Sequence, residues 1–201
     1  MFDFPKDAIK FKDFQKNFSL KEYSKGYRGI IYTLNFNNKR FAVKVPAKEE
    51  LIPSFKKEAL ILKFLNEKGI FFVPKLIYIG EDFFVYEFIE GITFKQFLKT
   101  SNNKDSKIIL RKLLIYSYCL DKLGVFKDEF QRPFTNVLVN NRKVFLLDFE
   151  RGALNKFWKN VPQFLQFLLA LKILSKDEII LFGRKYKKNP WEVIKAVLKK
   201  I

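Results

Sequence analysis

The 201-residue sequence changes character at Gly91, and this change constrains the fold more than any other feature. Before Gly91, β-rich runs alternate with turn residues, which is typical of an antiparallel sheet. After Gly91, most of the sequence favours helices. We therefore predict an α+β protein with a β-rich part at 1–90 and a mainly helical part at 91–201.

The β-rich part contains the signals of two hairpins with one helix between them. Its strands are predicted at 29–36, 40–45, 76–79 and 83–88. Asn37 and Asn38 join the first two strands, because asparagine tolerates the positive φ of a tight turn. The helix is expected to begin at Pro53 and to end before Gly69.

The second part contains one small hairpin among its helices. The predicted elements are a short helix at 93–98, a long helix at 106–123, strands at 137–139 and 144–147, and further helices toward the C-terminus. Gly124 is expected to end the long helix.

The charge balance of the chain favours anionic partners. There are 39 lysine and arginine residues against 21 acidic ones, so the formal net charge is +18. Such an excess favours polyanionic partners, which are nucleotide phosphates, RNA, DNA or an anionic membrane face. A general preference for lysine in the composition is the alternative explanation. With 48% hydrophobic and 30% charged residues, the chain is expected to be globular.

Cysteine and histidine usage excludes several kinds of site. Cys119 is the only cysteine, so no internal disulfide can form, and its apolar surroundings favour a buried small residue. The absence of histidine excludes histidine bases and histidine-ligated metals. The most apolar run, at 164–174, is too short to cross a bilayer. We expect a cytoplasmic protein without a membrane span.

Lys44 and Glu58 are candidates for a buried ion pair. Lys44 lies within an apolar strand, and Glu58 lies on the apolar face of the helix that follows. Phe55, Ile61, Leu62 and Leu65 share that face at about 100° per residue. A carboxylate at the centre of an apolar face is costly unless it is paired. Lys44 is therefore the expected partner of Glu58.

Asp148 and Asn136 are candidates for a magnesium site. Asp148 ends an apolar strand, and Asn136 lies across the small hairpin from it. Carboxylate and amide oxygens are the hard ligands that Mg²⁺ prefers. A turn or capping role for Asp148 is the alternative.

Gly26 and Gly29 precede a strand, where a backbone without Cβ can approach a phosphate and present its N–H groups. An ordinary turn is the alternative. The loop is not a Walker A motif, because the Gly-Lys-Ser/Thr ending is absent.

In chain order, these features resemble the small, divergent end of the protein-kinase superfamily. The matching stretches are 24–29, 41–45, 133–139 and 146–150, with the helix that carries Glu58 between the second and third. The sequence is most similar to a group of small, mainly archaeal predicted Ser/Thr kinases related to RIO and lipopolysaccharide kinases. The resemblance implies a two-lobed kinase-like fold and an enzyme that binds ATP and Mg²⁺. A Ser or Thr of a protein, including its own, is the implied phosphate acceptor, and a small-molecule hydroxyl is the alternative.

The resemblance also implies roles for individual residues. Lys44 and Glu58 would position the α- and β-phosphates, and Asn136 and Asp148 would hold Mg²⁺. The residues implied to contact the nucleotide are Gly26, Gly29, Ala42, Lys44, Glu58, Glu87, Ile89 and Leu138. Within this set, the backbone at 87–89 would bind adenine.

The catalytic loop departs from the kinase pattern. The position of the usual aspartate is Gln131, five residues before Asn136. In the archaeal group a His-Gly-Glu-Leu-like tetrad precedes Arg-Pro, which makes Glu129 the base and leaves Asp128 as the alternative. Arg132 would orient the base or neutralise the γ-phosphate, and a solvated loop charge is its alternative. Glu150 stands where kinases have the glycine after Asp-Phe.

A second function class is compatible with the same sequence. A pseudokinase could bind nucleotide without turnover, or serve as a basic module that binds RNA or the ribosome. The basic run at 184–188 and the altered catalytic loop favour this alternative.

Overall fold

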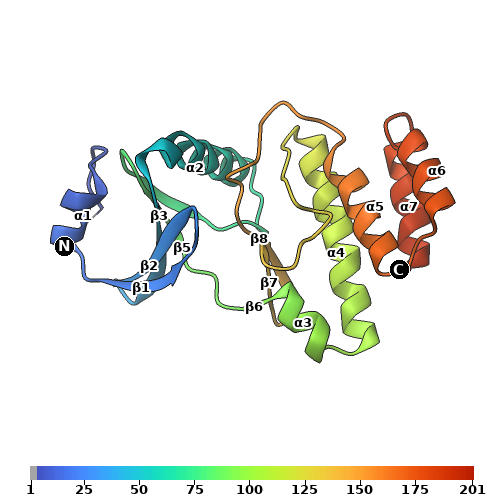
Figure 1. The fold of residues 1–201 in the computed structure, drawn as a ribbon, viewed down its shortest axis with the longest axis horizontal. Helices are drawn as coiled ribbons and strands as arrows, with labels where there is room; N and C mark the ends of the chain where they lie inside the picture. The colour runs from blue at the N-terminus through green and yellow to red at the C-terminus, as the bar shows by residue number, and fades with distance from the viewer. Residues whose placement is uncertain (1–3) are drawn as a thin grey trace. The chain divides into compact units, whose positions relative to one another are not determined.

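The computed structural model describes residues 4–201, which form two compact units that divide between Ile89 and Glu90 (Figure 1). The N-terminal unit is built on a five-stranded antiparallel sheet, and the C-terminal unit is mainly helical. The α+β class and the antiparallel N-terminal sheet are thus confirmed. The kinase-like arrangement of these elements stays a prediction.

The N-terminal unit has a strand order of β1-β2-β3-β5-β4. Its elements are α1 Phe11–Asn17, β1 Leu20–Lys25, β2 Gly29–Phe36, β3 Lys39–Pro46, the 3₁₀ turn η1 Glu49–Leu51, α2 Ile52–Glu67, β4 Leu76–Ile79 and β5 Phe84–Glu87. Asn37 and Asn38 join β2 to β3 with φ of 48° and 58°, as the hairpin prediction requires. Helix α2 packs against β3, β4 and β5.

Aromatic side chains dominate a core of the N-terminal unit. The buried members of this cluster are Phe14, Phe18, Leu34, Phe41, Val43, Tyr78, Phe83 and Val85. The rings of Phe14 and Phe18 stack with centroids 4.4 Å apart. The hydroxyl of Tyr78 donates to the Asp7 carbonyl and accepts from the Ile9 amide, both at 2.9 Å. The segment before α1 is therefore fixed to the sheet by both apolar and polar contacts.

The sequence did not predict α1 or β1. Helix α1 has 7 residues, and Lys10 at its start makes no side-chain capping bond. Its stability comes from burying Phe14 in the sheet, which is a tertiary effect. Strand β1 lies at the edge of the sheet and is almost entirely exposed, so it lacks an alternating apolar pattern.

The C-terminal unit combines a three-stranded sheet with five helices among the described residues. Its elements are β6 Ile92–Thr93, α3 Phe94–Thr100, α4 Asn103–Lys122, β7 Val137–Asn140, β8 Lys143–Leu146, α5 Asn160–Ala170, α6 Lys176–Tyr186 and α7 Pro190–Lys200. Helix α4 packs against α5 and α7, and α6 contacts both α5 and α7. The predicted hairpin at β7 and β8 is confirmed.

Backbone constraints explain why glycine occupies two positions of this unit. A Cβ on Gly91 would lie 2.9 Å from the Val139 carbonyl oxygen, so only glycine allows β6 to pair this closely with β7. Gly124 follows α4 with φ of 69°, the left-handed conformation typical of a residue that ends a helix.

Candidate functional site

Lys44 and Glu58 form a buried ion pair within the N-terminal unit. Nζ of Lys44 on β3 donates to Oε2 of Glu58 on α2 at 2.7 Å. Lys44 is 9% exposed and Glu58 is 3% exposed. The pairing predicted from the apolar helix face is confirmed. The pair holds the Lys44 ammonium at a fixed position between β3 and α2.

The pair sits inside an apolar neighbourhood. The buried residues of α2 are Phe55, Glu58, Ala59, Ile61, Leu62 and Leu65. The Phe55 ring lies 5.1 Å from Nζ of Lys44. Removing two charges from water costs several kcal/mol each, so such a pair adds little net stability compared with apolar residues of similar size. A gain in stability over an apolar pair therefore does not explain its presence.

A double-mutant cycle tests this interpretation. Lys44→Met alone takes the ammonium away from a buried carboxylate, and we expect the free energy of unfolding to fall by about 3–5 kcal/mol. Lys44→Met combined with Glu58→Leu removes both charges and should be much closer to wild type. Urea denaturation of the two single variants and the double variant measures the coupling. Losses that simply add would show that the two side chains do not interact energetically.

The predicted glycine loop connects β1 to β2. The amide of Gly26 donates to the carbonyl of Gly29 at 2.8 Å, which closes the turn. A Cβ on Gly29 would lie 2.6 Å from the Phe55 ring, so this glycine permits the loop to approach α2. Gly26 is exposed, and a Cβ there would meet its nearest neighbour at 3.6 Å. Close packing against α2 therefore accounts for Gly29, and Gly26 has room for a side chain.

Two of the residues predicted to contact the nucleotide, Ala42 and Glu87, lie on the neighbouring strands β3 and β5. Ala42 on β3 is paired in register with Tyr86 on β5, and both are buried. Glu87 ends β5 and is exposed, and Ile89 is the last residue of the unit. Leu138 belongs to the C-terminal unit, where it is half-buried on β7.

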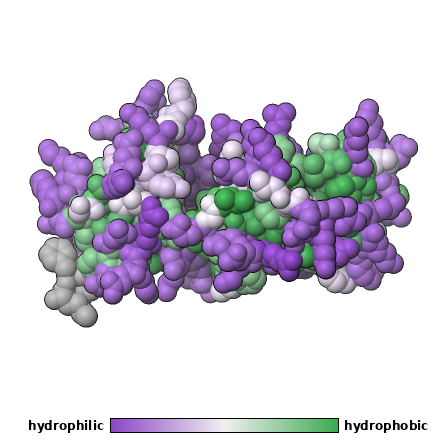
Figure 2. Space-filling model, turned by 90° about the horizontal axis from the view of Figure 1, so that it is seen from below, coloured by the Kyte–Doolittle hydropathy of each residue, from purple (hydrophilic) through white to green (hydrophobic). Residues whose placement is uncertain are grey.

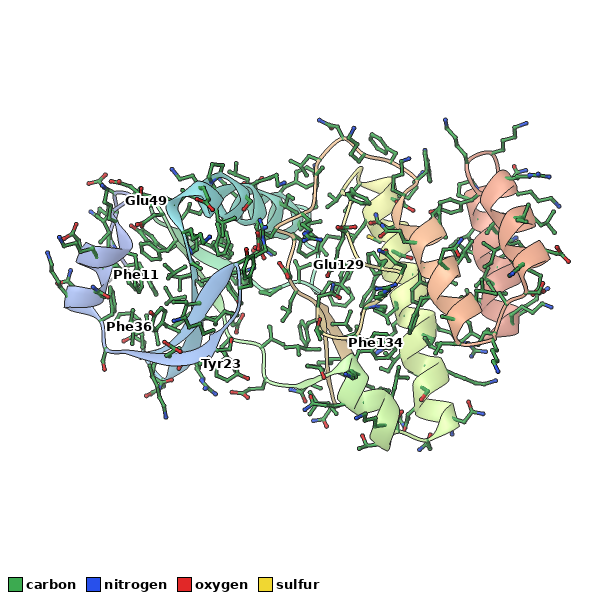
Figure 3. The ribbon with its side chains drawn as sticks, viewed as in Figure 1. Phe11, Tyr23, Phe36, Glu49, Glu129 and Phe134 are labelled. Atoms are coloured by element: carbon green, nitrogen blue, oxygen red, sulfur yellow. The ribbon has the colours of Figure 1, made fainter. Side chains whose placement is uncertain are left out.

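In the C-terminal unit, Glu129 and Asn136 are brought together. Nδ2 of Asn136 donates to Oε2 of Glu129 at 3.1 Å. Glu129 has a φ of 71°, a left-handed conformation that is uncommon for a side-chain-bearing residue and that often occurs at functional sites. Glu129 lies on the segment between α4 and β7, as does Phe134 (Figure 3). Of the two candidate bases, Glu129 makes this contact with the predicted metal ligand.

The side-chain oxygen of Asn136 lacks a hydrogen-bond donor among the described residues. Asn136 is 5% exposed, and its Oδ1 accepts no hydrogen bond from any residue in 4–201. Buried carbonyl oxygens nearly always have a donor or a cation, because desolvation without a partner costs about 1–3 kcal/mol. An orphaned amide oxygen is thus a candidate metal ligand.

Asp148 lies next to Asn136 through the backbone. The amide of Leu147 donates to the Asn136 carbonyl at 2.9 Å, so the two predicted metal ligands lie on hydrogen-bonded neighbouring segments of the chain. Asp148 is exposed and has a φ of 62°. The carboxylate oxygens of Asp148 and Glu150 lie within 4.8 Å of each other. The donor set of amide and carboxylate oxygens fits Mg²⁺. A ligand role for Glu150 was not predicted from the sequence, although its position two residues after Asp148 was the available signal.

Lys127 was not predicted as a site residue, yet it supports the Asp148 loop. It is 1% exposed, and its Nζ donates to the carbonyls of Leu147 at 2.6 Å and of Asp148 at 2.9 Å. The Phe149 ring lies 5.0 Å from the same ammonium. One side chain therefore links the segment that carries Glu129 to the loop that carries Asp148. We call this contact set the Lys127 bridge.

Asp121 and Asn160 fix the segment that carries Lys127. Asn160 Oδ1 accepts from the Lys127 amide at 2.8 Å, and its Nδ2 donates to the Val125 carbonyl at 2.7 Å. Asp121, fully buried on α4, caps α5 by accepting from the backbone amides of Lys159, Asn160 and Val161. The Asp121 carboxylate also accepts from Asn160 Nδ2 and from the Tyr186 hydroxyl.

Burial dominates the electrostatics of this network. It raises the pKa of the Asp121 carboxyl above its usual value, while the hydrogen bonds from Asn160, Val161, Tyr186 and Lys159 act in the opposite direction. Burial, together with the Asp121 charge, also raises the pKa of the Tyr186 hydroxyl, which stays a donor at every physiological pH. The hydrogen bonds that it accepts make Asp121 a structural acceptor that links α4, α5 and α6.

The remaining predicted residues line a pocket of about 560 Å³ within the C-terminal unit. The lining residues are Lys95, Asp128, Glu129, Gln131, Arg132, Phe134, Thr135 and Arg151. Arg132, predicted to act near the phosphate, is exposed at this pocket. Arg151 Nη1 lies 3.9 Å from Asp128 and 3.6 Å from Glu129, measured to their carboxylate oxygens. The structure therefore places both candidate bases on one polar surface.

Two further expectations concern residues outside this site. Cys119, which was expected to be buried, is half-buried on α4, and burial raises the pKa of its thiol, which makes it a poor nucleophile. None of the helices in residues 4–201 has both the length and the apolar composition needed to span a bilayer.

Comparison with known proteins assigns no relative to the chain. No model of a protein family matches the sequence, and no curated protein matches it. Function is therefore inferred from the side-chain arrangement in each unit.

Proposed function

We propose that the chain is an ATP- and Mg²⁺-dependent phosphotransferase whose acceptor is a Ser or Thr of a protein, with its own chain included among the acceptors. The buried Asn136 Oδ1 atom is the observation that carries this proposal, because it accepts no hydrogen bond from the described residues and the Asn136 backbone is bonded to Leu147, the neighbour of Asp148. A bound cation would supply the missing partner. The fixed Lys44 ammonium supports a second requirement of the reaction, which is a cation for the phosphates.

The proposed roles follow from the contacts of each residue. Asn136 and Asp148, with Glu150 nearby, would hold Mg²⁺, which when bound neutralises charge on the transferring phosphate. Lys44 would bind phosphate oxygens, and Glu58 would keep the Lys44 ammonium in place. Catalysis would then depend mainly on positioning and charge neutralisation.

Glu129 is the proposed base. Its carboxylate accepts from Asn136, so an acceptor hydroxyl that approaches Glu129 would also lie close to a metal ligand. Asp128 stays the alternative base, since it lines the same pocket. A cytoplasmic location is part of the proposal, because ATP is available there and the single Cys119 is compatible with a reducing compartment.

Mg²⁺-dependent binding of ATP is the first test. Saturating ATP with Mg²⁺ should raise the melting temperature of the wild type by several degrees, because ligand at about 100 times its Kd adds about 2.7 kcal/mol to the free energy of unfolding. The shift should be much smaller in Asp148→Ala and in Lys44→Met. Asp177→Ala, at an exposed position on α6, is the matched control and should keep the full shift. A folded wild type that gains no stability from ATP with Mg²⁺ would contradict the proposal.

A basic binding module is the second candidate, and one observation favours it. Arg184, Lys185, Lys187 and Lys188 are all exposed at the end of α6, and Ile180 and Leu181 on the same helix are also exposed. Hydrophilic side chains cover most of the face shown in Figure 2. Clustered cations near apolar side chains can bind RNA phosphates and bases. RNA binding that weakens steeply with salt, in a protein that ATP does not stabilise, would favour this candidate.

A further inference from the structure

We propose that the pocket beside Glu129 selects acceptor segments in which acidic residues flank the Ser or Thr. This inference rests on the proposed phosphotransferase function and adds a substrate class to it. The pocket brings together three parts of the C-terminal unit that are far apart in sequence, which are α3, the segment at 128–135, and the loop after β8.

The three parts are held in place by backbone and ring contacts. The amide of Lys95, on the first turn of α3, donates to the Phe134 carbonyl at 3.0 Å. The Phe134 ring packs edge-on against Phe167 of α5, with centroids 5.5 Å apart. Arg151 follows the Asp148 loop, which the Lys127 bridge ties to the segment carrying Glu129. The spacing of charges around the pocket is thus fixed by the fold.

The charges of the pocket favour an anionic ligand. Arg151 is the cation that lies near the carboxylates of Asp128 and Glu129. Lys95 and Arg132 form no ion pair with any residue in 4–201. Two cations that form no ion pair therefore line a pocket that also holds the proposed base, and the lining has three cations against two carboxylates. A carboxylate of the bound peptide would neutralise them while the Ser or Thr hydroxyl of the same peptide approaches Glu129.

The walls of the pocket favour a peptide over a small molecule. Pockets that take small organic ligands are mostly apolar and enclose the ligand. Here Phe134 is the single apolar lining residue, and Lys95, Gln131, Arg132, Thr135 and Arg151 are exposed. An open, charged pocket of about 560 Å³ is better suited to the side chains of an extended peptide segment that stays partly in solvent.

Peptide binding without nucleotide tests the inference. The probes are two fluorescent peptides of equal length in which alanine replaces the acceptor serine, one with Asp and Glu flanks and the other with Asn and Gln flanks. We expect the acidic peptide to bind the full chain about tenfold more tightly, measured by fluorescence anisotropy at low salt. Lys95→Glu should weaken its binding about tenfold, because the reversal removes an attraction and adds a repulsion.

Lys99→Glu is the matched control, because Lys99 is also exposed on α3 but does not line the pocket. It makes the same change in net charge and should alter binding less than twofold. Equal binding of the two peptides, or equal losses in the two variants, would overturn the inference. Failure of ATP to stabilise the protein, with the peptide preference intact, would instead overturn the proposed phosphotransferase.

Discussion

Asp148→Asn is expected to reduce phosphate transfer by about a thousandfold while leaving the fold intact. The change keeps the size of the side chain but removes the negative charge that would hold Mg²⁺ beside Asn136 Oδ1. Because Asp148 is exposed, little packing is lost. Transfer from γ-labelled ATP to the chain itself or to a generic protein acceptor, followed across a range of Mg²⁺ concentrations, measures the effect.

Asp177→Asn provides the control for this experiment, since it removes an exposed carboxylate from α6 in the same unit. It should transfer phosphate at the wild-type rate. If Asp148→Asn were as active as this control at every Mg²⁺ concentration, Asp148 would not be a metal ligand. The turn or capping role considered from the sequence would then explain its place at the end of the strand.

Asp121→Ala is expected to lower the free energy of unfolding by about 3–5 kcal/mol, the largest stability loss that we predict for a single substitution outside an ion pair. The substitution would leave the amides of Lys159, Asn160 and Val161, of which the last two are buried, without their acceptor and would remove the cap of α5. For a chain of this length, the melting temperature should fall by about 2–4 °C per kcal/mol. Urea denaturation measures the loss directly.

Two comparisons separate the carboxylate from general damage to the helix. Tyr186→Phe removes a single hydrogen bond to Asp121 and should cost about 1–2 kcal/mol. Lys107→Ala, at an exposed position on α4, should change stability by less than about 0.5 kcal/mol. A loss below 1 kcal/mol in Asp121→Ala would mean that water replaces the carboxylate without cost.

Local signals in the sequence predicted much of the fold. Asn37 and Asn38 gave the hairpin, because the positive φ they adopt is a property of the turn itself. Glu58 could be paired with Lys44 because the helical period places it among apolar residues. Helix α1 was missed because its stability depends on packing of Phe14 against the rings of Tyr78 and Phe83, which no local pattern reveals.

The candidate site was predicted less completely, and the reason is the sequence distance between its parts. The motif positions Asn136 and Asp148 lie near each other along the chain. Lys127, however, reaches the Asp148 carbonyl across 21 positions, and Asp121 reaches the Asn160 amide across 39. A buried lysine or aspartate looks in the sequence like any other charged residue. Its partners become visible only once the backbone is folded.

The Lys127 bridge has a consequence for related sequences. Because one ammonium holds the carbonyls of Leu147 and Asp148, the residue at this position and the conformation of that loop cannot vary independently. A homologue with an apolar residue in place of Lys127 must supply another donor to the Asp148 carbonyl or lose the bend that presents the carboxylate. Position 127 and the residues of the Asp148 loop should therefore co-vary. A lysine-to-apolar change at position 127 without compensation would mark a lineage in which the site has lost its function.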